Sequence, residues 1–307
     1  MTPVLSSSQL NAKLGHEIFF KAECLQKVGA FKARGAVNFF VHQKEKGTLP
    51  KQVVAFSSGN HAQAVTWAAS LFGTSAEILM PAYVSKIKLR ATEGYGARVT
   101  LWQSREETER IAKSMEKEGA ILIPPYDDDQ IICGQGTACL EALSQTPDDL
   151  NAVFAPCGGG GLLSGTLLAA KGVRPKLKVF GAEPLNSNDA AQSLRTGKIV
   201  CFSESPETIA DGARARSVSE RTFHYLKQLD GFYEITEDEI LGWTQWISHY
   251  LKIRCEPTSA LGMAGAARWL REQPQRKKVL VIVSGGNLDH ETELKVWGQD
   301  RLSTLPR

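Results

Sequence analysis

One lysine of this 307-residue chain stands in a setting that is unusual for a cation. Lys32 lies in the segment GAFKARGA, flanked by Phe31 and Gly35, shortly after the strand-like run EIFFKAE. Most isolated lysines are solvated surface cations. In an apolar setting, however, desolvation favours the neutral amine, which is a nucleophile that forms Schiff bases with carbonyl compounds. Lys32 is therefore a candidate for covalent chemistry.

A run of glycines is the second candidate. The segment APCGGGGLLSGTLLAA places Gly158, Gly159, Gly160 and Gly161 between a strand-like run and an Ala/Leu-rich helix. Glycines let the backbone curl so that several N–H groups converge, and the following helix adds its positive N-terminal end. This arrangement predicts a loop that holds a phosphate group.

The sequence leaves open which molecule carries that phosphate. Glu183 follows the loop at about the spacing at which a dinucleotide fold places its ribose-binding acid. Against that alternative, no frame of the loop matches G-x-G-x-x-G: from Gly158 the last position is Leu163, and from Gly159 it is Ser164. A nucleotide site would also leave Lys32 and two further segments without a role.

The first of these segments is SSGNHAQAV, between a strand-like run and a helix-like run. It carries Ser57, Ser58, Gly59, Asn60 and His61. Exposed backbone N–H groups at such a helix start can bind a carboxylate, so we expect this loop to bind substrate. Ser and Asn also favour helix caps for their own sake, and each residue alone fits that alternative equally well.

The second segment is VIVSGGN, in which a buried-looking strand ends at Ser284 just before two glycines. Alone it would be a turn. A phosphate loop, a desolvated lysine, an anion-binding loop and a serine at a strand end together indicate pyridoxal phosphate.

The elements that must position these residues follow an alternating pattern. Short apolar runs, from EIFF near the N-terminus to KVLVIVSGG near the C-terminus, are separated by helix-length segments. Alternating strands and helices predict an α/β fold with parallel sheets. We expect two parallel-sheet domains with the active cleft between them: a larger domain of residues 1–51 and 129–307, and a smaller one of residues 52–128.

Composition limits the partners. The formal net charge is +3 with no run of Lys and Arg, so neither nucleic acid nor a membrane surface is expected. The six cysteines show no CxxC pair or zinc spacing, and reduced thiols favour the cytoplasm. We see no export signal and no apolar stretch that could span a bilayer. The expected partner is a small molecule.

Taken in order, the motifs resemble those of the fold type II pyridoxal-phosphate enzymes, in particular the branch of serine racemases, threonine and serine dehydratases and threo-3-hydroxyaspartate ammonia-lyases. The likeness runs nearly from end to end, through the segments TPVLSSSQLN, FFKAECLQKVGAFKARGA, FSSGNHAQA, PPYDDDQIICGQGT, PCGGGGLLSG, GAEP, ETIADGA, CEPTSALG and VSGGNLD.

The resemblance implies roles for single residues. Lys32, next to Phe31, would bind the cofactor covalently and remove the Cα proton of the substrate. Asn60 would bond the phenolic oxygen of the cofactor, and Ser284 would face its pyridine nitrogen. Ser58 matches the hydroxyl on the opposite cofactor face in racemases. The loop from Gly158 to Gly161 would hold the phosphate.

A serine opposite the pyridine nitrogen, unlike an aspartate, does not stabilise a protonated ring, which makes the ring a weaker electron sink. The expected activity is therefore that of a dehydratase, or ammonia-lyase, which converts threonine, serine or threo-3-hydroxyaspartate to a 2-oxo acid and ammonia by α,β-elimination. Serine racemase activity is the alternative, and a nucleotide-binding protein without the cofactor is a remote one.

In metal-dependent members of this branch, the segment that aligns with EPLNSND binds a divalent cation. The matching groups here are Glu183, the carbonyl of Ser187 and Asp189, and oxygen ligands suit Mg²⁺, Ca²⁺ or Mn²⁺. The alternative is an acidic loop that caps a helix with Asp189.

The family also implies a homodimer. The chain departs from common family patterns at Ala30, at Cys133 and at its N-terminus, where an additional helix is usual, so the dimer contact could be weaker here.

Overall fold

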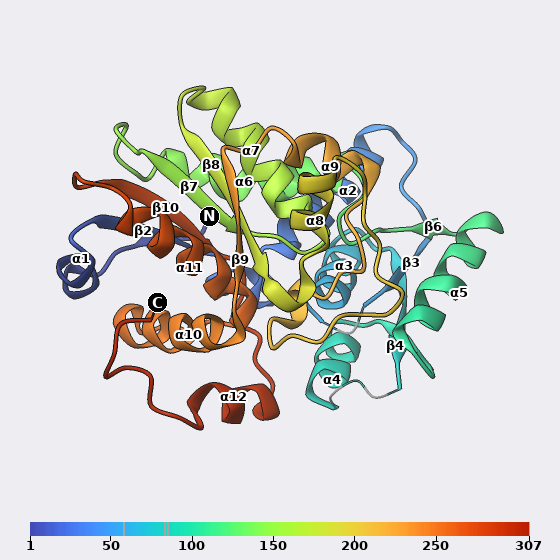
Figure 1. Cartoon of the computed structure of the whole chain (residues 1–307). Coiled ribbons are helices and arrows are strands. Elements are labelled where there is room, and N and C mark those ends of the chain that lie inside the picture. Colours follow the sequence, from blue (N-terminus) through green and yellow to red (C-terminus); the bar gives the residue numbers. More distant parts are fainter. Residues whose placement is uncertain (58, 83, 85, 307) are drawn as a thin grey trace.

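Two mainly parallel sheets lie side by side in the molecule, each flanked by helices (Figure 1). The computed structural model describes residues 1–57, 59–82, 84 and 86–306. The strands are β1 (Val4–Leu5), β2 (Glu17–Ala22), β3 (Gln52–Phe56), β4 (Ser75–Pro81), β5 (Arg98–Trp102), β6 (Ile121–Leu122), β7 (Ala152–Pro156), β8 (Lys178–Pro184), β9 (Gly231–Ile235) and β10 (Lys278–Val283).

Helices connect most of the strands. They are α1 (Ser8–Leu14), α2 (Lys32–Glu45), α3 (Asn60–Leu71), α4 (Lys86–Gly94), α5 (Arg105–Lys117), α6 (Asp129–Leu143), α7 (Gly161–Val173), α8 (Asp189–Thr196), α9 (Glu220–Leu226), α10 (Glu237–Leu251), α11 (Pro257–Arg271) and α12 (His290–Trp297). Among the described residues, no helix is both long and apolar enough to cross a membrane.

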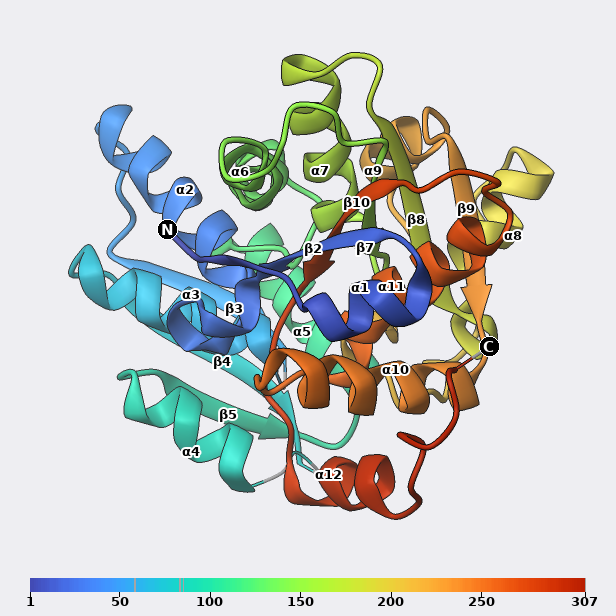
Figure 2. The ribbon, with the colours of Figure 1, turned by 90° about the vertical axis from the view of Figure 1, so that its left-hand side faces the viewer.

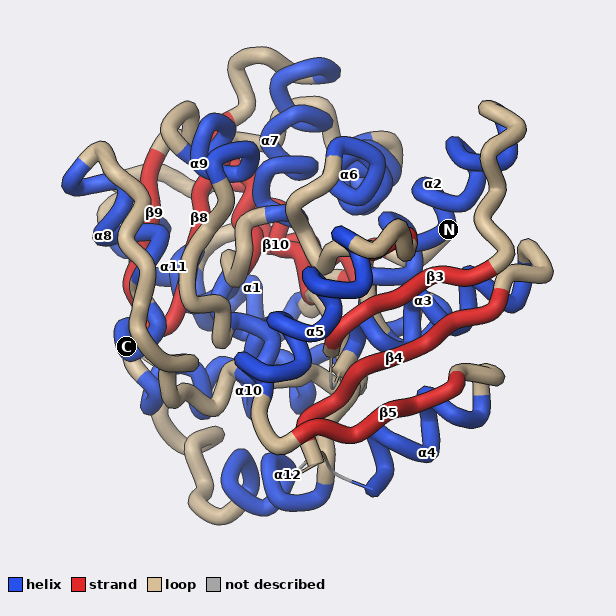
Figure 3. The backbone as a smooth tube through the Cα atoms, turned by 90° about the vertical axis from the view of Figure 1, so that its right-hand side faces the viewer, coloured by secondary structure: helices blue, strands red, loops and turns tan. Residues whose placement is uncertain are grey.

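The larger sheet has the strand order β1-β2-β10-β7-β8-β9, in which only the β1–β2 pair is antiparallel. The smaller sheet has the order β5-β4-β3-β6 and is parallel throughout. Figure 3 shows β3, β4 and β5 as neighbouring strands of this smaller sheet. The predicted α/β class with two parallel sheets is confirmed, and the prediction lacked only the edge strands β1 and β9.

Both faces of the larger sheet are buried, which explains the unbroken apolar run of β10. Val279, Val281 and Val283 point to a core shared with α10 and α11, whereas Leu280 and Ile282 point to a core shared with α6 and α7. This alternation follows from the two-residue repeat of a strand. Figure 2 shows α1, α10 and α11 on one face of the sheet.

Helix α2, which begins at Lys32, packs against α3 and α6. Its Phe39 and Phe40 join the core of the smaller sheet, although residues up to 51 were assigned to the larger domain by sequence. The domain boundaries therefore stay a prediction. All six cysteines are free thiols.

The backbones of α2 and α6 touch directly. A Cβ atom on Gly134 would lie 2.6 Å from the Cα atom of Gly35, a distance that forces backbone movement. Because neither Gly35 nor Gly134 has a side chain, α6 packs directly against the first turns of α2.

We expect Gly134→Ala to lower the free energy of unfolding by about 1–3 kcal/mol, because the added methyl group must push α2 away from α6. Gly172→Ala is the control, since a Cβ atom on this glycine of α7 meets nothing within 4 Å. It should raise stability by about 0.5–1 kcal/mol. Urea unfolding measures both changes, and equal effects would contradict the proposed contact.

Candidate active site

The residues singled out in the sequence meet where strands of both sheets end. Carboxyl ends of parallel strands share one edge of a sheet, and the crevice beyond that edge is the usual ligand site of α/β folds. Here β3 leads into Ser57, β7 leads into the glycine loop, and β10 leads into Ser284. The crevice holds a cavity of about 1130 Å³. The predicted site residues that line it are Phe31, Lys32, Ser57, Gly59, Asn60, His61, Gly158, Gly159, Gly160, Gly161 and Ser284.

Lys32 is the first residue of α2, and its amine points into this cavity. The preceding Phe31 donates its N–H to the carbonyl of Ser284 at 2.9 Å, which joins the helix start to the end of β10. The Nζ atom donates to the carbonyl oxygen of Pro125 and lies 5.2 Å from the centroid of the Phe31 ring. Burial lowers the pKa of Lys32 to about 8. A substantial share of the amine is therefore neutral near physiological pH.

The glycine loop lies at the N-terminus of α7, whose first N–H groups have no partner within the helix. Gly160 has a φ of 89°, a left-handed conformation that favours glycine. A Cβ atom on Gly159 would collide with the ring of Tyr126, so the loop also leaves no space for a side chain. The backbone N–H groups and the helix dipole can together bind an anion.

The loop after β3 leads into a second helix N-terminus at the cavity, that of α3. Gly59 donates its N–H to the hydroxyl of Ser57 at 3.2 Å, and α3 begins at Asn60. Ser58, the predicted hydroxyl on the second cofactor face, lies outside the described residues.

His61 is the first buried residue of α3. Burial and the charge of Lys32 lower its pKa to about 3, so the ring is neutral. Its Nε2 atom lies 2.9 Å from the carbonyl oxygen of Ile123, which can only accept. The proton is therefore on Nε2, which donates to that carbonyl.

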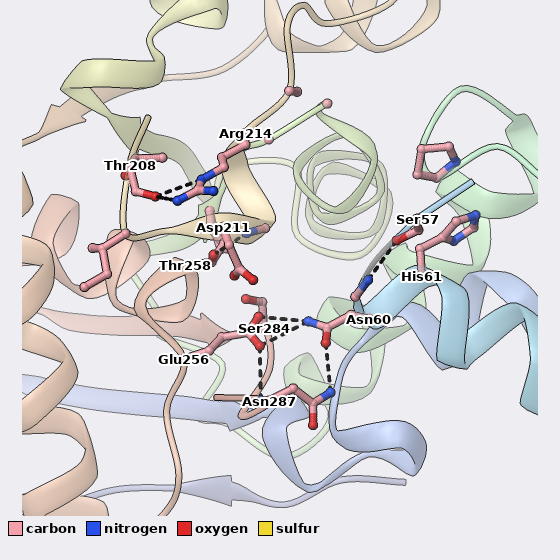
Figure 4. Close-up of a pocket in the computed structure, with 18 of the residues that line it drawn as sticks. Ser57, Asn60, His61, Thr208, Asp211, Arg214, Glu256, Thr258, Ser284 and Asn287 are labelled. Carbon is pink, nitrogen blue, oxygen red and sulfur yellow. Dashed lines mark hydrogen bonds between the residues drawn. The ribbon is translucent and has the colours of Figure 1, made fainter. Parts of the chain in front are cut away.

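Asn60 is held by two residues from the C-terminal part of the chain (Figure 4). Its Nδ2 atom donates to both carboxylate oxygens of Glu256, at 3.0 and 3.1 Å. Its Oδ1 atom accepts from Nδ2 of Asn287 at 2.8 Å. The carbonyl of Val28 can only accept, so the Asn287 atom that it contacts is Nδ2, and the Asn60 atom that accepts from the same Nδ2 is Oδ1. Burial and the charge of Asp211 raise the pKa of Glu256 to about 7.

The same Asn287 side chain reaches the turn that leads into α2. Its Nδ2 atom also donates to the carbonyl of Val28 at 2.7 Å. Val28 has a φ of 57°, which is a strained conformation for a β-branched residue. One amide group thus connects Asn60 to the segment that carries Lys32.

Comparison with known proteins identifies the family of this chain. Residues 1–285 match the family model described as "Pyridoxal-phosphate dependent enzyme". The chain belongs to this family. It is 44% identical to an L-threo-3-hydroxyaspartate ammonia-lyase of Saccharomyces cerevisiae, over 94% of this chain and 88% of that protein. It is 41% identical to a serine racemase of Schizosaccharomyces pombe, over 94% and 90%. The crystal structure of a threonine deaminase of T.th. superposes with a TM-score of 0.87, at 39% identity and 94% and 93% coverage.

Membership of the pyridoxal-phosphate enzymes confirms the predicted family and cofactor, and the cavity fits that cofactor. It offers an amine of lowered pKa, a glycine loop at a helix N-terminus for the phosphate, and the hydroxyl of Ser284 at the end of β10. The individual roles of these residues stay predictions.

None of the predicted cation ligands lines the cavity, and two of them are buried carboxylates. Glu183 accepts the N–H of Ala191 at 2.7 Å through Oε1, so it is Glu183 that caps α8. Its Oε2 atom and Oδ2 of Asp189 are buried without a hydrogen-bond partner. Burial raises the pKa of both groups, that of Asp189 to about 7. Unpaired buried oxygens fit a bound cation, although no cluster of three His, Cys, Asp or Glu side chains occurs among the described residues.

Sequence reasoning gave no role to several residues that line the cavity. Glu256 and Asn287 hold Asn60, and Lys88 of α4 forms ion pairs with Asp211 at 2.7 Å and Asp289 at 3.5 Å. All of these except Lys88 lie in segments that carry the family resemblance, namely ETIADGA, CEPTSALG and VSGGNLD. The Glu-Pro pair at the start of α11 was the sequence signal for Glu256.

The lowered pKa of Lys32 predicts how the cofactor is attached. When apoprotein is mixed with pyridoxal phosphate, the rate of covalent attachment should rise with pH, reach half of its maximum near pH 8 and level off at higher pH, because only the neutral amine attacks. Stopped-flow absorbance measures this rate. Lys32→Ala should show no covalent phase. A midpoint near 10.5, the ordinary value for lysine, would contradict the assignment.

Proposed function

We propose that this protein is a pyridoxal-phosphate-dependent ammonia-lyase that removes water from a 3-hydroxy amino acid and releases a 2-oxo acid and ammonia. Serine, threonine and threo-3-hydroxyaspartate are the candidate substrates. The proposal is supported by similarity to a hydroxyaspartate ammonia-lyase and to a threonine deaminase structure, each over 94% of the chain.

The observation that carries the proposal is the group at the end of β10. Ser284 is 1% exposed, and its Oγ atom lies 3.0 Å from Oγ of Ser259. The residue expected to face the pyridine nitrogen therefore has a neutral hydroxyl. Bound pyridoxal phosphate supplies the electron-withdrawing ring that allows the Cα–H bond to break. Ser284, as a neutral partner, would leave the ring less electron-withdrawing than a carboxylate partner would, and removal of the Cα proton would then favour departure of the β-hydroxyl, which is released as water.

The protein groups have distinct roles in this proposal. Lys32 takes the Cα proton, a step that its lowered pKa favours because the neutral amine is the base. The N–H groups at the start of α3 hold the substrate carboxylate. Asn60, fixed by Glu256 and Asn287, would contact the bound cofactor.

Racemisation of serine is the second candidate, favoured by 41% identity to a serine racemase. It requires proton donors on both faces of Cα, with Ser58 in that role opposite Lys32. The dinucleotide alternative is set aside, because the chain belongs to the pyridoxal-phosphate enzymes.

Residues 52–128 act in this proposal as the smaller domain that closes over the substrate, and two copies of the chain form a homodimer. Closure is supported by Lys88 of α4, which reaches across the cleft to Asp211. The side chain of Lys88 is 16% exposed and that of Asp211 is 42% exposed, so water partly screens this ion pair.

Assays on holoenzyme test the activity. With L-serine, D-serine, L-threonine and L-threo-3-hydroxyaspartate, at least one L-substrate should give 2-oxo acid faster than it exchanges enantiomers. Lys32→Ala should fold normally yet lose turnover, because no amine remains to link the cofactor or take the proton. Enantiomer exchange with little oxo acid would favour the racemase, and activity retained by Lys32→Ala would refute the role of Lys32.

We also propose that Glu183, the carbonyl of Ser187 and Asp189 bind a divalent cation that stabilises the fold. Chelation should lower the melting temperature by about 5 °C, and Mg²⁺, Ca²⁺ or Mn²⁺ should restore it. Asp189→Asn should abolish the response. Glu239→Gln is the control, since Glu239 is a buried carboxylate already paired with Arg268 at 2.6 Å. Loss of the response in the control, or none in the native protein, would count against the site.

A further inference from the structure

A second buried hydroxyl stands directly behind Ser284. Ser259, in the first turn of α11, is 0% exposed and Ser284 is 1% exposed. Their Oγ atoms are 3.0 Å apart, and either can donate. Hydroxyl groups buried this deeply need defined partners, because water cannot reach them. The direction of this hydrogen bond decides whether the Ser284 hydroxyl can donate a hydrogen bond into the cavity.

The surroundings of Ser259 limit that direction. Gly285 donates its backbone N–H to Oγ of Ser259 at 2.8 Å, and this bond cannot reverse. The single hydroxyl hydrogen of Ser259 then has two acceptors in reach: the carbonyl oxygen of Gly285 at 2.8 Å and Oγ of Ser284 at 3.0 Å. The Gly285 carbonyl also accepts the N–H of Glu256 at 3.1 Å, so it keeps a partner when Ser259 turns away.

Counting donors and acceptors selects one arrangement when an unprotonated pyridine nitrogen faces Ser284. If Ser259 donates to Gly285, Ser284 has two options, and both are costly. It can donate to Ser259 and leave the ring nitrogen buried without a donor, or donate to the ring and leave two hydroxyl oxygens 3.0 Å apart with no hydrogen between them. If Ser259 donates to Ser284, Ser284 donates to the ring, and every group is paired. Among the described residues, no carboxylate is hydrogen-bonded to either serine, so neither has an anion that would favour a protonated ring.

We propose that Ser259 is a positioning residue that turns the Ser284 hydroxyl toward the ring nitrogen. The inference rests on the proposed function, in which Ser284 faces that nitrogen. The chain of bonds runs from the Gly285 N–H through Ser259 and Ser284 to the ring. Each donor in such a chain is strengthened by the bond that it accepts. Ser259 thereby increases the electron withdrawal of the ring without protonating it.

The test uses holoenzyme loaded with cofactor labelled with ¹⁵N at the pyridine nitrogen. In Ser259→Ala the ¹⁵N resonance should move toward that of a pyridine that accepts no hydrogen bond. The kcat for 2-oxo acid release should fall about fivefold with KM unchanged, the loss expected for one weakened hydrogen bond. A resonance and kcat equal to those of the native protein would overturn the proposal, as would a shift toward pyridinium.

A matched control separates positioning from packing. Thr244→Val removes another buried hydroxyl, which donates to the carbonyl of Ile240 at 2.7 Å within α10. Both variants should lower the melting temperature modestly, but only Ser259→Ala should move the ¹⁵N resonance. If both or neither move it, Ser259 only packs against its neighbours.

A double-variant comparison tests whether Ser259 acts through Ser284. In a Ser284→Ala background, Ser259→Ala should cause no further change in the resonance or in kcat, because the bond between them is already lost. Additive effects would overturn the proposal. If Ser284→Ala itself leaves the resonance unchanged, the assignment of Ser284 within the proposed function fails, and Ser259 loses its positioning role with it.

Discussion

The rest of this site depends on the burial of one amine, that of Lys32. Lys32 forms no ion pair with any described carboxylate, and its pKa is lowered by burial alone. An acid beside it would restore the ammonium ion and suppress its reactivity. The fold therefore brings a lysine to the edge of two sheets while it directs nearby carboxylates elsewhere: Glu256 to Asn60, and Asp211 to Lys88. The amine itself contacts neutral groups, namely the carbonyl of Pro125 and the ring of Phe31.

Three segments far apart in the chain must be brought into register around that amine. The turn before α2, the start of α3 and the strand end at β10 meet through a few bonds: Phe31 with Ser284, Asn60 with Glu256, and Asn287 with both Val28 and Asn60. Because Asn60 belongs to the segment after β3 and its partners follow β9 and β10, these bonds also cross between the two sheets. Movement of one sheet relative to the other is thereby linked to the orientation of the groups that are proposed to hold the cofactor.

Much of this could be predicted from the sequence, because its signals are local. Continuous apolar runs identified the buried parallel strands, and Gly158–Gly161 and Lys32 stand out within their own segments. The edge strand β9 was missed because its segment, GFYEI, begins with a glycine and is interrupted by Glu234, so it shows no continuous apolar run. Glu256, Asn287 and Ser259 were missed for a different reason. Their partners lie up to 259 residues away, so only the folded chain reveals that a carboxylate, an amide and a hydroxyl orient other side chains. The close crossing of α2 and α6 likewise depends on two glycines that are far apart in the sequence.

The left-handed conformation of Val28 lowers the stability of the turn that precedes Lys32. Such a conformation costs a β-branched residue roughly 1–2 kcal/mol, which is a sizeable part of the margin by which a typical domain stays folded. Valine is also stiff, and in this turn it restricts the chain to few alternatives once Asn287 holds its carbonyl. A glycine would remove the strain but would widen the range of conformations ahead of the reactive lysine. The chain thus accepts a less stable turn in exchange for a narrower distribution of amine positions.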